Sequence, residues 1–575
     1  MTDIRRTVLW VVFTMSLVLL WDGWQKHNGH PSMFSPAAPK AAAVAASGNG
    51  NTATGLPTPM ANGATTPAAI ATGAAPTLQA EKVLVKTDVL NVTLDSLGGD
   101  VSRVELLNYL DAPEPGLFDP LMELVGLKQK HAVQQQPIVL LDAATRSYKA
   151  QSGLLGSKGE QLPTHNTLMT VVPGERTLKD GMAELTVRME SPEVGGVKLV
   201  KTFTFKRGDY VIGVRHEVIN AGAAAVTPQV YVQLVRDGVS ASKGSGFSST
   251  FTGPAVYSDT AKFHKVEFKD IDKDKVDVEK TAANGWVAMV QHYFASAWLH
   301  DEAGQREFFV NKVKGAAPDQ YAVGMVFTMP TLAPGASQIR DDQLFVGPQE
   351  EKKLAALAPG LELVKDYGIF AILAKPLFWL LEKLHNYLGN WGWAIIALVV
   401  LLKAAFYWLN ASAYRSMAKM KAVGPKIQAM RERLKDKPQE MQQEMMRIYK
   451  EEKVNPVGGC LPIFLQMPFF MGLYWVLLST VEMRGAPWLG WITDLSAKDP
   501  YFILPILMTL SSLAQVALNP KSPDPVQAKM MWFMPLAFSF MFFVFPSGLV
   551  LYWLTNNILS IAQQWMINKQ LGVQN

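Results

Sequence analysis

The spacing of hydrophobic positions predicts a membrane-spanning helix at the N-terminus. An apolar run from Thr7 to Trp24 follows Arg5 and Arg6. As a helix it would measure about 27 Å, close to the roughly 30 Å of a bilayer core. Small residues of the kind found at signal-peptide cleavage sites do not follow the run. We therefore predict an uncleaved anchor over residues 1–24, with a cleaved signal peptide as the alternative. The two arginines would keep this terminus in the cytoplasm.

The next two segments have different patterns. Residues 25–80 are mostly Ala, Pro, Gly, Thr and Ser with almost no charge, which predicts a disordered linker. Over residues 81–350 apolar and polar positions alternate, as in "KVLVKTDVLNVTL". The stretch "GVKLVKTFTFKRGDYVIGVRHEVIN" predicts a hairpin that turns at residues 207–209. Many strands over this length predict a large all-β sandwich domain.

Residues 361–389 show helical spacing with one apolar face. Charged residues fall off that face, so we predict an amphipathic helix lying on the membrane surface. Pro376 would stand in its first turn and Gly389 at its end. The residues of the apolar face are Leu377, Leu381, Leu384 and Leu388.

Five longer apolar runs lie within a predicted core domain over residues 390–568. The loop over 410–456 carries 11 Lys/Arg and 6 Asp/Glu, whereas the loop over 482–500 carries 2 and 3. The first loop is therefore predicted to be cytoplasmic and the second external. With the anchor, this is a polytopic α-helical membrane protein of six spans, with both termini cytoplasmic and the β-domain outside. The five runs are 391–409, 460–480, 501–518, 530–545 and 549–566.

The basic loop itself predicts a helical hairpin over residues 412–456. Its apolar positions are rich in methionine, and two interpretations stay open. The two apolar faces could pack together, or they could form a docking surface whose methionines adapt to varied partners and whose charge suits anionic headgroups or ribosomal RNA. The methionines concerned are Met417, Met420, Met430, Met441 and Met445.

Lys403 is a charge inside the apolar stretch "LVVLLKAAFYW". It lies six residues before Leu409, about 9 Å from the predicted cytoplasmic end of its helix. Its ammonium could snorkel to the interface, or it could face a water-filled groove between helices. The five runs hold no Asp or Glu to pair with it, so either interpretation requires a water path. Polar residues of other spans that could line such a groove are Gln466, Ser511, Gln515 and Asn556.

Composition supports a membrane protein without a cofactor. Hydrophobic residues make up 49% of the chain and charged residues 18%. Only Trp286 and Trp298 of the 15 tryptophans lie between residues 25 and 378, and the others gather where interfacial aromatics are expected. Cys460 is the single cysteine, and no Cys/His spacing predicts a metal site. No Gly precedes a Lys, so a Walker A loop is absent from the sequence.

Residues 365–567 resemble the YidC family of membrane-protein insertases. The resemblance rests on "GNWGWAII", "SMAKMKAVGPKIQAMRERLKD", "QEMMRIYKEEKVNPVGGCLPIFLQMPFF", "DLSAKDPYFILPILM" and "FPSGLVLYW". It implies a bacterial inner-membrane insertase and chaperone rather than an enzyme. The implied architecture is a five-helix core around a hydrophilic groove open to the cytoplasm, plus a periplasmic β-supersandwich of the sugar-mutarotase type.

The same resemblance implies roles for individual residues. Lys403 takes the place of the basic groove residue, where many relatives have arginine. Tyr552 or Trp553 falls where the family has aromatics that contact substrate, and the substrate would slide along the third and fifth spans. The implied partners are nascent membrane proteins, the Sec translocon, the ribosome and the phospholipid bilayer. A secondary transporter or channel is the alternative, against which stand the missing intramembrane carboxylates and the lack of repeated halves.

Overall fold

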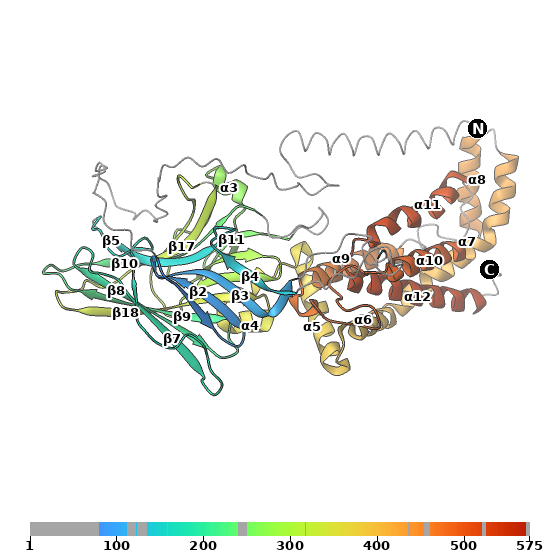
Figure 1. Cartoon of the computed structure of the whole chain (residues 1–575). Helices are drawn as coiled ribbons and strands as arrows, with labels where there is room; N and C mark the ends of the chain where they lie inside the picture. The colour runs from blue at the N-terminus through green and yellow to red at the C-terminus, as the bar shows by residue number, and fades with distance from the viewer. Residues whose placement is uncertain are drawn as a thin grey trace. The chain divides into compact units, whose positions relative to one another are not determined.

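The structure is a computed structural model that describes residues 80–111, 122, 135–157, 159–239, 250–316, 318–434, 437–452, 461–519 and 525–570. The chain divides into two compact units, the first ending at Lys365 and the second formed chiefly by the residues from Asp366 on. The first holds the strands and the second the long helices (Figure 1). The prediction of a β-sandwich domain followed by a helical core is confirmed. The predicted anchor, and the predicted linker apart from residue 80, lie outside the described residues.

The first unit contains two antiparallel sheets, each of nine strands among the described residues. The first sheet has the order β1-β2-β3-β5-β10-β17-β16-β13, with β4 paired to β3. Its strands are β1 (Lys82–Lys86), β2 (Leu90–Asp95), β3 (Asp100–Asp111), β4 (Gln136–Asp142), β5 (Lys149–Gly156), β10 (Pro228–Asp237), β13 (Thr281–Ala282), β16 (Arg306–Lys312) and β17 (Gln320–Thr328).

The second sheet has the order β12-β11-β14-β15-β18-β9-β8-β7-β6. Three short helices accompany the sheets: α3 (Phe268–Asp272), α4 (Glu351–Leu357) and η1 (Leu361–Val364). The strands of the second sheet are β6 (Thr170–Val171), β7 (Glu184–Glu190), β8 (Val197–Lys206), β9 (Val211–Asn220), β11 (Gly253–Ser258), β12 (Lys262–Lys265), β14 (Trp286–Gln291), β15 (Phe294–Leu299) and β18 (Ser337–Pro348).

The predicted hairpin forms from β8 and β9. The two strands pair antiparallel and are joined by a turn at residues 207–210. Gly208 has φ +71°, a left-handed conformation that glycine adopts without steric cost. Phe203 and Phe205 point inward and are buried, while Lys206 is exposed. The alternation in the sequence therefore reports the two faces of this hairpin.

Lys201 breaks that alternation, because its side chain is fully buried between the sheets. Its Nζ donates to the carbonyls of Gly98, at 2.6 Å, and Ser152, at 2.8 Å. Burial lowers the pKa of Lys201 to about 8, against the opposing attraction of Asp100. Polar contacts of this kind join the two sheets across an otherwise apolar interior, since a buried charge is tolerated only when its protons are satisfied.

His165 makes the stability of the β-domain depend on pH. It is buried and its Nδ1 lies 2.6 Å from the Tyr231 hydroxyl. Burial, reinforced by the positive charges of Lys149 and Lys201, lowers the pKa of His165 to about 3. The unfolded chain takes up this proton below about pH 6.5, so stability falls as pH drops from there toward 3, by about 1.4 kcal/mol per pH unit.

We expect His165→Gln to remove that one-proton dependence from the β-domain. Urea unfolding of residues 80–365 between pH 6.5 and 4.5 should show a stability slope smaller by about one proton than in the unsubstituted domain. The comparison of slopes cancels any constant loss from the missing hydrogen bond. An unchanged slope would show that the imidazole is already protonated in the folded domain.

The second unit is helical in all of its regular described elements. A loop over residues 480–502 connects α9 (Leu461–Ser479) to α10 (Ile503–Leu518) and includes η3 (Val481–Met483). The remaining elements are η2 (Gly368–Phe370), α5 (Ala371–Leu388), α6 (Trp391–Ala405), α7 (Tyr407–Arg433), α8 (Pro438–Glu451), α11 (Pro525–Phe542) and α12 (Ser547–Gln570).

Helix α5 lies within the predicted amphipathic region 361–389, but it begins before Pro376. The helix starts at Ala371, so Pro376 lies inside it and not in its first turn. The proline removes one backbone bond, to the carbonyl of Ile372, a residue whose side chain is exposed. Gly389 ends the helix as predicted, with φ +69° and its N–H donating to the His385 carbonyl. The buried leucines of α5, Leu377 and Leu381, belong to the core of this unit.

The predicted span over 391–409 is bent. α6 ends at Ala405 and α7 starts at Tyr407, with a change of direction of 67°. The cause is local: Phe406 has φ −94° and ψ 13°, outside the helical range. Lys403 therefore lies in the last turn of α6 and not deep within a longer helix, which corrects its expected position. Taken together, α6 and Tyr407–Ser416 have the length and apolar composition of a membrane crossing, which no single helix among the described residues has.

One end of the helical unit is closed by the 480–502 loop. Ile492 and Leu495 of this loop are buried against the core of the unit. Asp499 is buried too, and its carboxylate accepts hydrogen bonds from the N–H groups of Tyr501 and Leu504, which caps the start of α10. The N–H of Gly548, at the start of α12, donates to the Leu495 carbonyl. The loop thus holds the start of α10 through the Asp499 carboxylate and the start of α12 through a backbone hydrogen bond.

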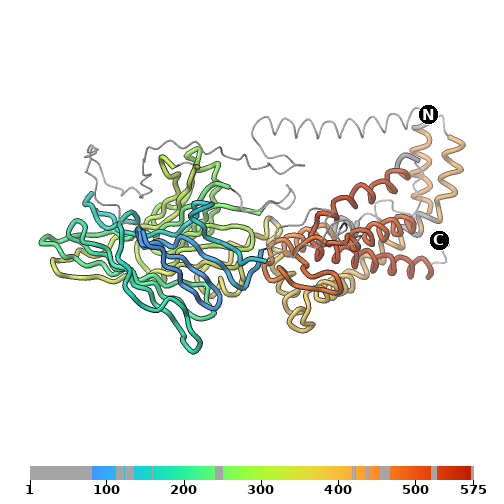
Figure 2. Tube along the Cα trace, in the orientation of Figure 1, coloured from blue at the N-terminus to red at the C-terminus, as the bar shows by residue number. Residues whose placement is uncertain are grey.

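The basic segment forms the predicted hairpin from the second half of α7 and from α8 (Figure 2). Val423, Ile427 and Met430 of α7 are buried against residues of α8. Helix α7 continues through Pro425. Ion pairs such as Lys426 with Glu452 connect the two arms at the surface.

Candidate functional site: a polar pocket between four helices

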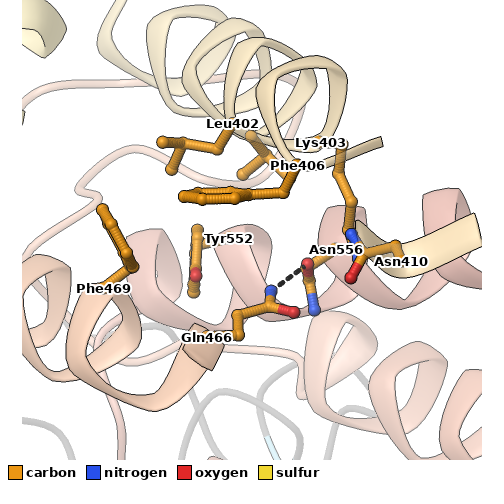
Figure 3. A pocket seen from close by; sticks show the side chains of 9 residues that line it. Leu402, Lys403, Phe406, Asn410, Gln466, Phe469, Tyr552 and Asn556 are labelled. Atoms are coloured by element: carbon orange, nitrogen blue, oxygen red, sulfur yellow. Dashed lines mark hydrogen bonds between the residues drawn. The ribbon is translucent and has the colours of Figure 1, made fainter. Parts of the chain in front are cut away.

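A small pocket, partly open to solvent and with a cavity volume of about 20 Å³, lies where α6, α7, α9 and α12 meet. Figure 3 shows its side chains converging from these helices. Four of the predicted groove residues line it: Lys403, Gln466, Tyr552 and Asn556. The full lining is Val399, Leu402, Lys403, Phe406, Asn410, Gln466, Phe469, Tyr552 and Asn556.

Lys403 provides the only charge among the described residues of this lining. The last turn of α6 directs its side chain toward Asn410 and Asn556 (Figure 3). Its Nζ donates to the Oγ of Ser560 on α12, at 2.7 Å. An ammonium has three protons, so this bond leaves two donors for water or a bound group.

An amide pair forms the opposite side of the pocket. The Nε2 of Gln466 on α9 donates to the Oδ1 of Asn556 on α12, at 2.6 Å (Figure 3). Tyr552 of α12 lines the pocket beside this pair. An asparagine and a glutamine keep further donor and acceptor capacity after one shared bond. The pocket therefore offers a cation together with neutral hydrogen-bonding groups.

Three predicted groove residues lie outside this lining. Ser511 accepts a hydrogen bond from Asn557 at 3.3 Å, in the contact between α10 and α12. Gln515 follows on α10, one turn further along, and is half-buried. The Trp553 ring lies between the rings of Phe470 and Phe542, with centroids 4.4 and 4.9 Å away, so it joins α9, α11 and α12.

Residues that sequence reasoning missed also belong to the site. Asn410 lines the pocket from α7, because the bend at Phe406 brings the start of α7 alongside the end of α6. Ser560 was not missed, since the sequence places it on the polar face of the last span, one helical turn after Asn556, and it contacts the site through Lys403. The apolar wall made by Phe406 and Phe469, whose rings lie 5.1 Å apart, had no sequence signal.

The methionines of the hairpin are used mainly for packing between its arms. Met430 is buried, and Met441 and Met445 pack against the same cluster from α8. The side chains of Met417 and Met420 lie outside the described residues. Met446 is exposed on the other side of α8. Of the five methionines predicted for a docking surface, the three whose side chains the structure describes therefore face the interior of the hairpin.

Comparisons with known proteins agree with this architecture. Residues 82–380 match the family described as YidC periplasmic domain, and residues 383–574 match the family described as 60Kd inner membrane protein. The first match contains all the strands and the second contains the pocket. A β-sandwich domain joined to a helical inner-membrane core is thus the class of protein that fold and site define.

The particular family follows from full-length relatives. The chain is 54% identical to the membrane protein insertase YidC of Cupriavidus necator, over 99% of this chain and 98% of that one. It is 52% identical to the protein of the same name from Ralstonia nicotianae, with coverage of 99% and 98%, and 51% identical to that of Burkholderia cenocepacia, with coverage of 99% and 99%. A solved structure of an active YidC insertase matches with 18% identity over 84% of this chain and 92% of that one, at a TM-score of 0.37. The chain belongs to the YidC family.

Proposed function

We propose that this chain inserts membrane proteins into the bacterial inner membrane by admitting their polar segments into the pocket beside Lys403. The observation that carries the proposal is a lysine on a partly open pocket that mixes amide and apolar side chains and lies among helices with apolar outer faces. A charge among membrane helices is costly unless it faces water or a partner. Its presence marks a path for polar groups.

The energetics need no external energy source. A segment rich in Leu, Ile, Val and Phe gains a few tenths of a kcal/mol per residue on entering the bilayer. The barrier comes from the polar flank that must follow it. A hydrated pocket shortens the apolar distance that this flank crosses, and the Lys403 ammonium attracts acidic groups. The apolar part can then leave sideways along α9 and α11, whose outer faces expose residues such as Met467 and Phe540.

The proposed membrane arrangement has six spans. They would comprise the N-terminal anchor, the bent crossing that begins with α6, and then α9, α10, α11 and α12, with both termini in the cytoplasm. The excess of Lys/Arg in the 410–456 loop supports the hairpin being cytoplasmic, and the β-domain would then be periplasmic. The proposed partners are nascent membrane proteins, the Sec translocon and the ribosome. The chain would insert its substrates alone or together with the translocon.

Site-specific crosslinking tests this route. A photo-reactive residue placed at Asn410 or Gln466 should capture the polar flank of a ribosome-stalled nascent membrane protein. One placed at Met467 or Phe540 should capture its apolar segment. The same probe at Ile339, on the surface of the β-domain, serves as the control. Equal capture from all positions, or capture from none of the pocket positions, would contradict the proposed route.

Deleting residues 82–348, which removes all the described strands, should leave insertion of a small membrane protein within about twofold of normal. The physical reason is that the helical unit has its own buried core, formed by residues from Tyr367 on. The rate of substrate insertion into proteoliposomes, divided by the amount of the reconstituted variant, measures the effect. A loss as large as that from removing the pocket charge would place part of the chemistry in the β-domain.

A further inference from the structure

Ser560 is a buried hydroxyl whose contacts all concern the pocket. It lies on α12 and is 3% exposed. Its Oγ accepts the 2.7 Å hydrogen bond from Lys403 and itself donates to the Asn556 carbonyl, also at 2.7 Å. One hydroxyl thus joins α12 to the last turn of α6.

The hydrogen-bond inventory fixes the direction of this hydroxyl. A serine has one proton and two lone pairs, and an ammonium can only donate. Ser560 must therefore accept from Lys403, and its own proton is directed along α12 to the Asn556 carbonyl. One lone pair of the Ser560 hydroxyl therefore receives a proton of the Lys403 ammonium.

We propose that Ser560 is a positioning residue that holds the Lys403 ammonium in the pocket, ready to exchange onto an acidic group of the incoming chain. This positioning role rests on the proposed function of Lys403 and specifies what holds its ammonium in place. A lysine side chain has several rotatable bonds and costs up to about 2 kcal/mol of conformational entropy to order. Ser560 orders it before the substrate arrives.

The neutral character of Ser560 makes the exchange favourable. A hydrogen bond between two charged groups is roughly twice as strong as one between neutral groups, and a carboxylate is a better acceptor for an ammonium than a hydroxyl. An aspartate or glutamate at position 560 would neutralise Lys403 permanently. A serine holds it in place yet yields it to a carboxylate, and the two remaining ammonium protons already face the pocket.

Insertion kinetics of a matched substrate pair test the proposal in full-length protein reconstituted into proteoliposomes. One substrate is a small two-span protein with an acidic translocated segment, and the other has the same segment with Asn and Gln in place of Asp and Glu. We expect Ser560→Ala to slow insertion of the acidic substrate about fivefold, which corresponds to about 1 kcal/mol, the net size of a typical hydrogen bond, and to slow the neutral one by less than twofold. Ser560→Thr, which keeps the hydroxyl, should restore the rate.

A double substitution separates positioning from simple support of the fold. In Lys403→Met protein, adding Ser560→Ala should cause no further slowing, because the two side chains act as a unit. Thr509→Ala is the control: it removes a hydroxyl that bonds within α10 to the Pro505 carbonyl, away from the pocket. It should leave both rates unchanged.

The possible outcomes are distinct. Equal slowing of both substrates by Ser560→Ala, or additive effects in the double variant, overturns the positioning role. If Lys403→Met itself does not slow the acidic substrate, the proposed function of the charge fails and not only this refinement. If Ser560→Ala does not accumulate in membranes, Ser560→Cys decides: it keeps the volume but is a weak acceptor, and a rate equal to that of Ser560→Thr would overturn the proposal.

Discussion

Replacing Lys403 by alanine should reduce insertion of substrates with acidic translocated segments by tenfold or more. The variant loses the only charge among the described pocket residues, and with it a charge-assisted hydrogen bond to the substrate that is worth about 1.5–3 kcal/mol. That free energy corresponds to a factor of about ten or more in rate if it applies to the rate-limiting step. Complementation of an insertase-depleted strain, together with the initial rate in proteoliposomes, measures the loss.

Lys403→Arg is the matched variant. Arginine keeps the positive charge but presents it through a planar group with five donors, so its contact with Ser560 changes while its attraction for a carboxylate remains. We expect Lys403→Arg to support growth and to insert the acidic substrate within about threefold of normal, a difference of less than 1 kcal/mol. Full activity of Lys403→Ala on acidic substrates would end the groove-charge mechanism.

The second large effect concerns the β-domain. Asp342 is fully buried and its carboxylate lies 3.1 Å from His216 Nδ1, 3.2 Å from His300 Nδ1 and 3.0 Å from Arg340 Nη2. Burial by itself would raise the pKa of Asp342, but hydrogen bonds from the two histidines and the charge of Arg340 outweigh it and lower the pKa below its usual range. The carboxylate therefore stabilises the fold above its unfolded pKa, and this contribution is lost as pH falls into the acid range.

Asp342→Ala should lower the free energy of unfolding of the β-domain by about 3–5 kcal/mol, because it leaves a buried guanidinium without its counter-charge. Urea unfolding of residues 80–365 at pH 7 measures it. The adjacent Asp341 is an instructive control, since it forms an exposed ion pair with Arg215. Asp341→Ala should cost no more than about 1 kcal/mol. Similar losses from the two substitutions would show that the buried cluster contributes no more than a surface pair.

The sequence was sufficient to predict the faces of the strands and the polar character of the core spans. Phe203 and Phe205 follow the period of a strand, and Lys403 is conspicuous because its neighbours are apolar. The buried position of Lys201 was not predictable. Its acceptors, the carbonyls of Gly98 and Ser152, lie 103 and 49 residues away along the chain, in the β2–β3 turn and in strand β5 of the first sheet.

The bend between α6 and α7 was also hidden. The stretch "KAAFYW" contains neither proline nor glycine, the residues that ordinarily mark a sharp change of helix direction. Lys403 was therefore expected farther from the end of its helix than the structure places it. The prediction of Ser511, Gln515 and Trp553 as groove residues followed helical polarity and family resemblance, neither of which says which neighbouring helix a side chain meets. Ser511 meets Asn557 of α12, and Trp553 lies in the aromatic contact with α9 and α11.

The early end of α6 has a consequence for how a lone cation is tolerated among these helices. The peptide dipoles of a helix add up to about half a negative charge at its C-terminus. Because α6 stops at Ala405, Lys403 stands in the turn where that partial charge accumulates. The backbone thus supplies a diffuse counter-charge that cannot be protonated and cannot form a closed ion pair. The ammonium remains positive, yet it stays available to a carboxylate that arrives on another chain.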